Sequence, residues 1–135
     1  MAAGACPCGR VDARGRPRGL AQCCGPHLAG QPAPDAEALM RSRYTAYVLG
    51  DEQYLRATWS PDTCPSEVSA DPATRWLGLD VRDHRVIDTD HAEVEFVARY
   101  RVQGRGARIH ERSRFVRDAQ GRWLYVDGIF PGGAS

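Results

Sequence analysis

Between residues 36 and 49 the apolar side chains recur at three- and four-residue spacing, which predicts an amphipathic helix. Asp35 stands directly before this stretch, where its carboxylate can cap the first turn, and Gly50 follows it as a stop signal. A shorter stretch of the same kind covers residues 52–59, with Asp51 as its cap. This part of the chain therefore predicts two consecutive helices.

Farther along, a third and short helix is predicted over residues 71–78, because Pro72 stands near its start and Gly78 at its end. Beyond it the period changes to two, with apolar and polar residues alternating as in strands that bury one face. Short turns separate the later segments, so the strands should pair as antiparallel hairpins. The predicted strands are residues 79–88, 91–102, 107–117 and 122–129.

Helices followed by about four hairpin-connected strands predict an α+β fold, in which the helices pack on the concave face of a curved antiparallel sheet. A chain of 135 residues suffices for one sizeable core and a small appendage. Residues 31–35 are rich in proline and have the composition of a linker. We therefore divide the chain into a loop element, residues 1–30, and an α+β domain, residues 31–135.

The charges of the chain nearly cancel, giving a formal net charge of +1, so no global field draws the protein toward nucleic acid or an anionic membrane. No stretch approaches the roughly 18–20 consecutive apolar residues of a membrane span. The N-terminal residues run into cysteines instead of an apolar signal core. We expect a cytoplasmic protein with no specific nucleic-acid binding and no membrane span.

Four of the five cysteines form two close pairs near the N-terminus, Cys6 with Cys8 and Cys23 with Cys24. The segment that contains them is dense in glycine and proline, which excludes a long helix or strand, so an added cross-link must hold it. In a reducing compartment, clustered thiols are more often metal ligands than disulfides. Four thiolates suit a closed tetrahedral zinc site. We predict one structural zinc ion bound by these four cysteines.

Two alternatives to this zinc site stay open. His27 lies three residues after Cys24 and could replace a thiolate, although four cysteines already complete the set. A reactive thiolate at Cys23 or Cys24 would instead indicate redox chemistry. The fifth cysteine, Cys64, has no neighbour at ligand spacing, and we treat it as a bystander.

Two sets of residues resemble known families. The runs Cys6-Pro7-Cys8-Gly9 and Cys23-Cys24-Gly25-Pro26 resemble the SEC-C motif, a small zinc-binding element, although the loop between the two halves is longer here. Residues 39–47, Tyr54-Leu55, Thr58-Trp59 and residues 123–128 resemble the YchJ family of uncharacterised bacterial proteins. That resemblance implies a nuclear transport factor 2-like, or cystatin-like, cone that encloses a pocket, and it implies no assigned reaction.

In such a cone a ligand would lie between the first long helix and the inward side chains of the last strands. Glu111 shares a strand face with Ile109 and Phe115, which places a carboxylate among apolar neighbours. An inward Glu111 could serve as an acid or base. The alternative is a salt bridge from Glu111 to Arg43 or Arg99 that ties the sheet to the helix.

Asp127 has the same strand parity as Trp123 and Tyr125, so we expect it as a second acid of the pocket, with capping of the turn at Gly128 as the alternative. Arg43 is the arginine of the helix that we expect to point inward, paired with Glu111 or Asp127 or available to an anionic ligand. Aromatic residues should complete the walls. The predicted pocket residues are Arg43, Tyr44, Tyr47, Trp59, Glu111, Tyr125 and Asp127.

The sequence offers no Ser-His-Asp or Cys-His arrangement, and we assign no catalytic residue. The favoured hypothesis is a non-enzymatic interaction protein that binds zinc and meets a protein partner through the cysteine element. The first alternative is a small-molecule binder or an enzyme that uses the pocket, with Glu111 or Asp127 as acid or base. Thiol redox chemistry is the second alternative.

Overall fold

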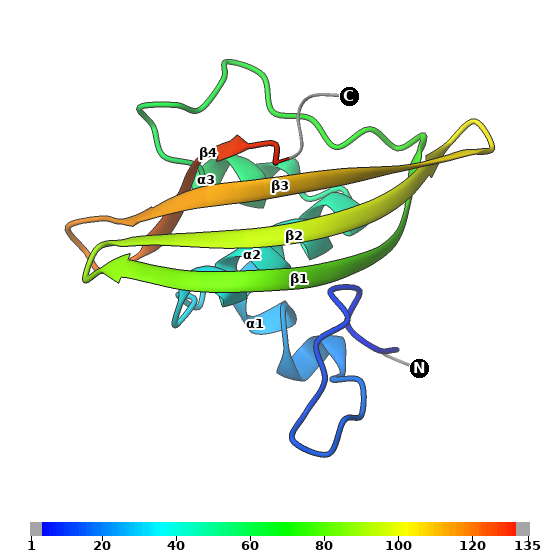
Figure 1. The fold of residues 1–135 in the computed structure, drawn as a ribbon, viewed down its shortest axis with the longest axis horizontal. Helices are drawn as coiled ribbons and strands as arrows, with labels where there is room; N and C mark the ends of the chain where they lie inside the picture. Colours follow the sequence, from blue (N-terminus) through cyan, green and yellow to red (C-terminus); the bar gives the residue numbers. More distant parts are fainter. Residues whose placement is uncertain (1–3, 132–135) are drawn as a thin grey trace.

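The computed structural model describes residues 4–131 and contains a small N-terminal element, two helices and a four-stranded sheet (Figure 1). The strands follow the order β1-β2-β3-β4, and each pairs antiparallel with the next, as the predicted meander requires. The elements are a 3-10 turn Leu20–Gln22, α1 Gly25–Leu28, α2 Ala36–Leu49, α3 Glu52–Ala57, β1 Thr74–Asp88, β2 His91–Val102, β3 Arg105–Arg117 and β4 Trp123–Ile129.

Helix α2 begins and ends where the sequence predicts. The carboxylate of Asp35 accepts a hydrogen bond from the backbone amide of Ala38 at 2.8 Å, which satisfies one of the free amides of the first turn. Gly50 ends the helix in the left-handed region with φ of +75°. None of the helices formed by residues 4–131 combines the length and the apolar character needed to cross a lipid bilayer.

Helix α3 is capped by Asp51, which accepts from the amide of Tyr54 at 3.0 Å, but it ends at Ala57 and not at residue 59. The chain leaves the helix early because it pairs with strand β4. The amide of Tyr125 donates to the carbonyl of Thr58 at 2.8 Å, and the amide of Ser60 donates to the carbonyl of Tyr125 at 2.7 Å. This contact fixes Trp59 beside the sheet.

The prediction of a helix over residues 71–78 is wrong, because strand β1 already begins at Thr74. Thr74 and Trp76 pair with the distal end of β2, opposite Val102 and Tyr100. The register then shifts between Trp76 and Gly78, so this glycine marks an irregularity in a strand and not the end of a helix. Long-range pairing overrides the local helix signal here.

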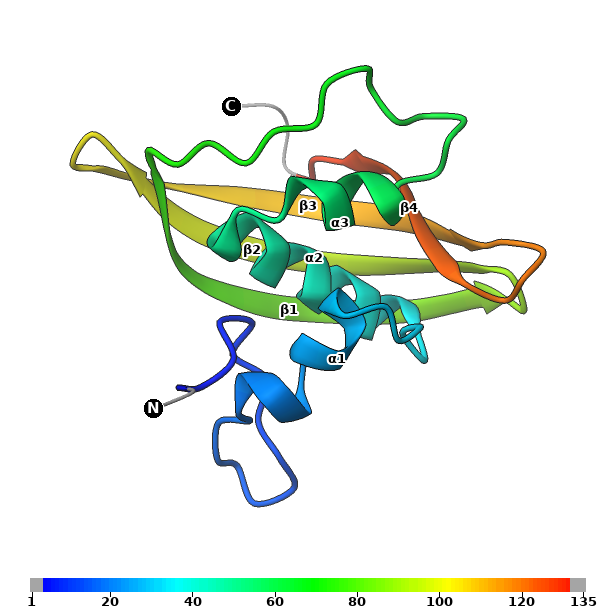
Figure 2. The ribbon, with the colours of Figure 1, turned by 180° about the vertical axis from the view of Figure 1, so that it is seen from behind.

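Both α2 and α3 lie on one face of the curved sheet, as Figure 2 shows from the helix side. Val94, Phe96 and Ala98 of β2 and Phe115 of β3 are buried on this concave face and share a core with Leu39, Met40 and Tyr44 of α2. On the convex face, Arg112 forms ion pairs with Asp83, Glu93 and Glu95. The concave face therefore supplies the core.

We predict that Asp35→Ala lowers the free energy of unfolding by about 1 kcal/mol, because α2 loses its N-cap hydrogen bond. Urea denaturation followed by circular dichroism measures the change. Asp62→Ala, at an exposed loop position, is the matched control and should leave the midpoint unchanged. Equal midpoints for both variants would contradict a capping function of Asp35.

Candidate metal centre and cone cavity

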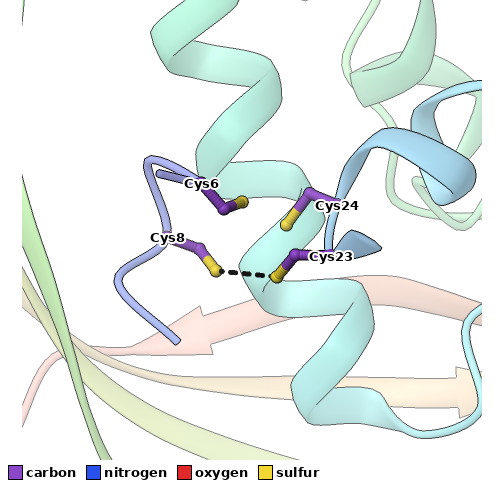
Figure 3. A group of neighbouring side chains, drawn as sticks. All are labelled: Cys6, Cys8, Cys23 and Cys24. Carbon is purple, nitrogen blue, oxygen red and sulfur yellow. Dashed lines mark hydrogen bonds between the residues drawn. The ribbon is translucent and has the colours of Figure 1, made fainter. Parts of the chain in front are cut away.

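The sulfur atoms of the two cysteine pairs converge beside helix α2 (Figure 3). Cys6, Cys8, Cys23 and Cys24 are 4 %, 0 %, 9 % and 2 % exposed, and their sulfurs all lie within 4.8 Å of one another. The sulfurs of Cys8 and Cys23 are 3.6 Å apart. Neighbouring sulfurs in a tetrahedral zinc centre with bonds of about 2.3 Å lie about 3.8 Å apart. The donor set and its spacing therefore fit zinc.

Two turns of the N-terminal segment bring the pairs together. The amide of Cys6 donates to the carbonyl of Arg18 at 2.7 Å, and antiparallel bridges close the loop between them. Gly9, with φ of +78°, turns the chain directly after Cys8. The amide of Cys23 donates to the carbonyl of Leu20 at 3.1 Å, at the end of the 3-10 turn. These turns bring the four sulfurs together, although one residue separates Cys6 from Cys8 and none separates Cys23 from Cys24.

Side chains of α2 contact this cysteine cluster directly. The hydroxyl of Thr45 lies 3.7 Å from the sulfur of Cys6. Arg41 donates from Nη1 to the carbonyl of Cys8 at 3.0 Å and approaches the Cys8 sulfur at 4.0 Å, while its Nε donates to Glu37 at 2.8 Å. A guanidinium beside the sulfurs favours the negative charge that four thiolates carry around a divalent ion.

The thiols influence one another. Hydrogen bonds from the Cys24 and Cys8 thiols lower the pKa of Cys6. Burial raises the pKa of Cys23 to about 12, and the hydrogen bond to Cys6 raises that of Cys24. A bound metal ion would displace the protons of these thiols.

The alternative ligand and the fifth cysteine lie elsewhere. His27 is directed through Nδ1 to the carbonyl of Gln31 at 2.9 Å. The sulfur of Cys64 lies 3.5 Å from the carbonyl of Pro65, in the loop that follows α3. The group of neighbouring ligand atoms includes neither residue; for Cys64 the sequence predicted this, whereas for His27 it left the question open.

A cavity of about 390 Å³ lies between α2 and the concave face of the sheet. Six of the seven predicted pocket residues line it, namely Arg43, Tyr44, Tyr47, Trp59, Glu111 and Tyr125. Trp76 and Tyr100 add further aromatic surface, with ring centroids 5.5 Å apart. The side chains of the cone therefore leave its interior open.

Arg43 points inward, as predicted, but its predicted partner is wrong. Within residues 4–131 it forms no ion pair with Glu111 or Asp127; its Nη1 donates to the Leu55 carbonyl at 2.8 Å and to the Thr58 hydroxyl at 2.7 Å. Its guanidinium carbon lies 5.0 Å and 4.7 Å from the ring centroids of Trp59 and Tyr125. Burial lowers the pKa of Arg43.

Glu111 lies on the concave face, where Ser113 and Tyr125 hold it in place of the expected arginine. Both hydroxyls donate to the same carboxylate oxygen, Oε2, at 2.7 Å and 2.9 Å. Burial and the negative charge of Glu111 raise the pKa of Tyr125, which keeps its hydroxyl protonated as the donor. Gly128 of β4 lies so close to the Glu111 carboxylate that a Cβ at this position would overlap it.

The prediction that Asp127 lines the pocket is wrong, because Asp127 lies outside the cavity. A β-bulge in β4 places Tyr125 opposite Phe115 but Asp127 opposite Arg114. The extra residue reverses the strand parity, so Asp127 faces outward. It accepts two hydrogen bonds of 2.6 Å from Arg114, whose guanidinium lowers the pKa of Asp127.

Sequence reasoning missed several residues that hold these sites. Arg41 and Thr45 contact the cysteines, and their four-residue spacing on one helix face was a usable signal. Trp76 was missed as a cavity wall because it was assigned to a helix. The hydroxyl donors of Glu111 depend on strand pairing between β3 and β4, which sequence spacing does not give.

The comparisons with known proteins agree with this architecture. The family model described as "YchJ, middle NTF2-like domain" matches residues 35–128. A UPF0225 protein of Polaromonas naphthalenivorans is 57 % identical over 130 residues, covering 91 % of this chain and 95 % of that relative. One from Ralstonia nicotianae is 60 % identical over 136 residues, covering 92 % and 90 %.

A solved structure has the same fold. It is the crystal structure, at 1.75 Å resolution, of a SEC-C motif-containing protein from Psychrobacter arcticus. The alignment has a TM-score of 0.74 at 29 % identity and covers 97 % of this chain and 85 % of that chain. The similarity therefore includes the N-terminal cysteine element as well as the cone.

We predict that Gly128→Ala lowers stability by about 1–3 kcal/mol, because the added methyl group displaces the Glu111 carboxylate from Ser113 and Tyr125. In a Glu111→Ala background the same glycine substitution should cost much less. Gly106→Ala, where a Cβ meets open space, is the control. Urea midpoints that fall equally in both backgrounds would refute the contact.

Proposed function

Because this chain belongs to the YchJ family, with its NTF2-like middle domain, we propose that it is a small-molecule-binding protein whose N-terminal element is held by a structural zinc ion. The observation that carries the binding function is the cavity of about 390 Å³, which falls in the size range of ligand pockets, about 300–1,000 Å³. A wall of mostly apolar and aromatic side chains with a few charged groups is typical of such sites.

The zinc part of the proposal rests on the four enclosed thiols. Structural zinc sites use four protein ligands, which leaves no open position for substrate, and the spacing of these sulfurs fits that geometry. The Psychrobacter protein is described as containing a SEC-C motif, and we extend to this chain the zinc binding that the motif implies. The ion would connect the two turns of the N-terminal segment to each other.

Thiol redox chemistry is supported less well, because reactive thiolates need access to solvent or a partner disulfide. All four clustered cysteines are at most 9 % exposed. Reduced, metal-bound thiols also agree with a cytoplasmic location, which we include in the proposal.

The interaction function favoured by the sequence becomes the second candidate. The exposed side chains of Arg14 and Arg16, in the loop between the two pairs, favour it, since they could meet an acidic protein surface. The cysteines themselves, however, share the buried core of α2 and the sheet. This burial favours a function of the cysteine element in stabilising the α+β domain over a function as a separate docking module.

We predict that the purified protein holds about one zinc per chain and that Cys8→Ser lowers this content severalfold, since the site loses one of four thiolates. Elemental analysis after gel filtration measures the ratio. Cys64→Ser removes a cysteine outside the cluster and should keep full zinc content. Stoichiometric zinc in Cys8→Ser, or no zinc in the unaltered protein, would refute the site.

The neutral dye prodan should bind saturably, with a blue shift of its fluorescence, because the cavity walls are largely apolar and carry several aromatic rings. Ala98→Leu should weaken binding by about tenfold or more, since Ala98 is a buried cavity residue and a larger side chain fills the space. Ala107→Leu, at an exposed position of the neighbouring strand, is the control. Absent or non-saturable binding would contradict the binding function.

A further inference from the structure

We propose that the natural ligand of the cavity is a small aromatic molecule without net charge, which accepts a hydrogen bond from Arg43 and donates one to Glu111. This inference rests on the binding function proposed above and specifies its ligand. Four features of the cavity support it: an unused donor edge, an unused acceptor, two opposite charges that do not pair with each other, and aromatic side chains in the wall.

Arg43 supplies the donor edge. Its residue is only 6 % exposed, and Nη1 is occupied by Leu55 and Thr58. Nη2 and Nε donate no hydrogen bond within residues 4–131, although a guanidinium offers five N–H donors. Buried donors normally have partners, so an acceptor on the ligand would satisfy this side of the cavity.

Glu111 supplies the acceptor. Both hydroxyl groups that hold it, from Ser113 and Tyr125, donate to Oε2. Oε1 accepts no hydrogen bond from residues 4–131. A carboxylate fixed through one oxygen is oriented, while the other oxygen can receive a hydrogen bond from an N–H or O–H group of a ligand.

The opposite charges of Arg43 and Glu111 favour a ligand without net charge. Arg43 and Glu111 both line the cavity, yet they do not form an ion pair, and Tyr125 contacts both of them through its ring and its hydroxyl. Asp71, the remaining charged wall residue, is exposed. An ionic ligand loses its hydration in such a site and gains attraction to one group at the cost of repulsion from the other. An uncharged molecule with separate acceptor and donor avoids this loss.

The aromatic side chains of the cavity wall favour a ligand that contains an aromatic ring. Tyr44 and Trp76 meet edge to face at 5.6 Å between centroids, and Trp59 and Tyr125 do so at 5.1 Å. Such rings offer faces and edges against which a planar ligand packs well.

Three probes that share an indole ring test whether the cavity prefers an uncharged ligand. The binding of each is measured by its displacement of prodan near neutral pH. They are indolepropionamide, which is uncharged, indolepropionate, which is an anion, and tryptamine, which is a cation. We expect the amide to displace the dye at a concentration about tenfold lower than either ion requires.

Glu111→Gln sharpens the test, because it keeps the side-chain shape but leaves Arg43 as the unbalanced charge. Indolepropionate should then gain about tenfold in affinity and become the preferred probe, a reversal that loss of structure alone would not produce. Asp127→Asn removes a carboxylate outside the cavity and should keep the preference for the amide. An unchanged far-UV circular dichroism spectrum of Glu111→Gln checks that its fold is intact.

A preference of the unaltered protein for the anion or the cation would overturn the inference, as would the failure of Glu111→Gln to reverse the order. Prodan binding without displacement by any of the three probes would also overturn it, while leaving the binding function in place. Failure of prodan itself to bind would instead refute the binding function.

Discussion

The period of helix α2 is the constraint on which both sites depend. Arg41 and Thr45 stand four residues apart and contact the cysteines, whereas Arg43 and Tyr47, also four residues apart, line the cavity. Since the same turns of one helix carry both pairs, the helix forms the boundary between the metal centre and the cone. The caps at Asp35 and Gly50 fix the length of this boundary. A metal ion in the cysteine cluster would therefore support the cavity wall through the helix, without taking part in ligand chemistry.

Within the cone, a second constraint orients the charged groups. The bulge in β4 turns Tyr125 inward and Asp127 outward, and Gly128 leaves room for the Glu111 carboxylate. Tyr125 then donates to Glu111 while its ring lies against Arg43. Two opposite charges thus remain in one cavity without neutralising each other directly. A ligand that pairs with both groups, as we propose, would offset the stability that leaving them unpaired costs.

Local chemistry made much of the fold predictable. Asp35, Gly50 and the alternation of residues 91–102 gave the helix limits and the central strand, and the close spacing of the cysteines indicated the cluster. Errors arose where distant pairing decides the outcome. Residues 74–78 joined β2 in place of forming a helix, and the bulge reversed the parity of Asp127. The partners of Arg43 came from the carbonyl and hydroxyl groups at the end of α3, which no spacing rule identifies.

We propose above that four thiolates hold one zinc ion and so fix the N-terminal segment on α2. Zinc K-edge X-ray absorption of the purified protein measures the ligands of that ion directly. We expect a shell of four sulfur atoms at about 2.3 Å and no nitrogen or oxygen ligand. A shell that includes nitrogen, as would follow if His27 replaced a thiolate, or a protein without zinc whose cysteines are oxidised, would contradict it.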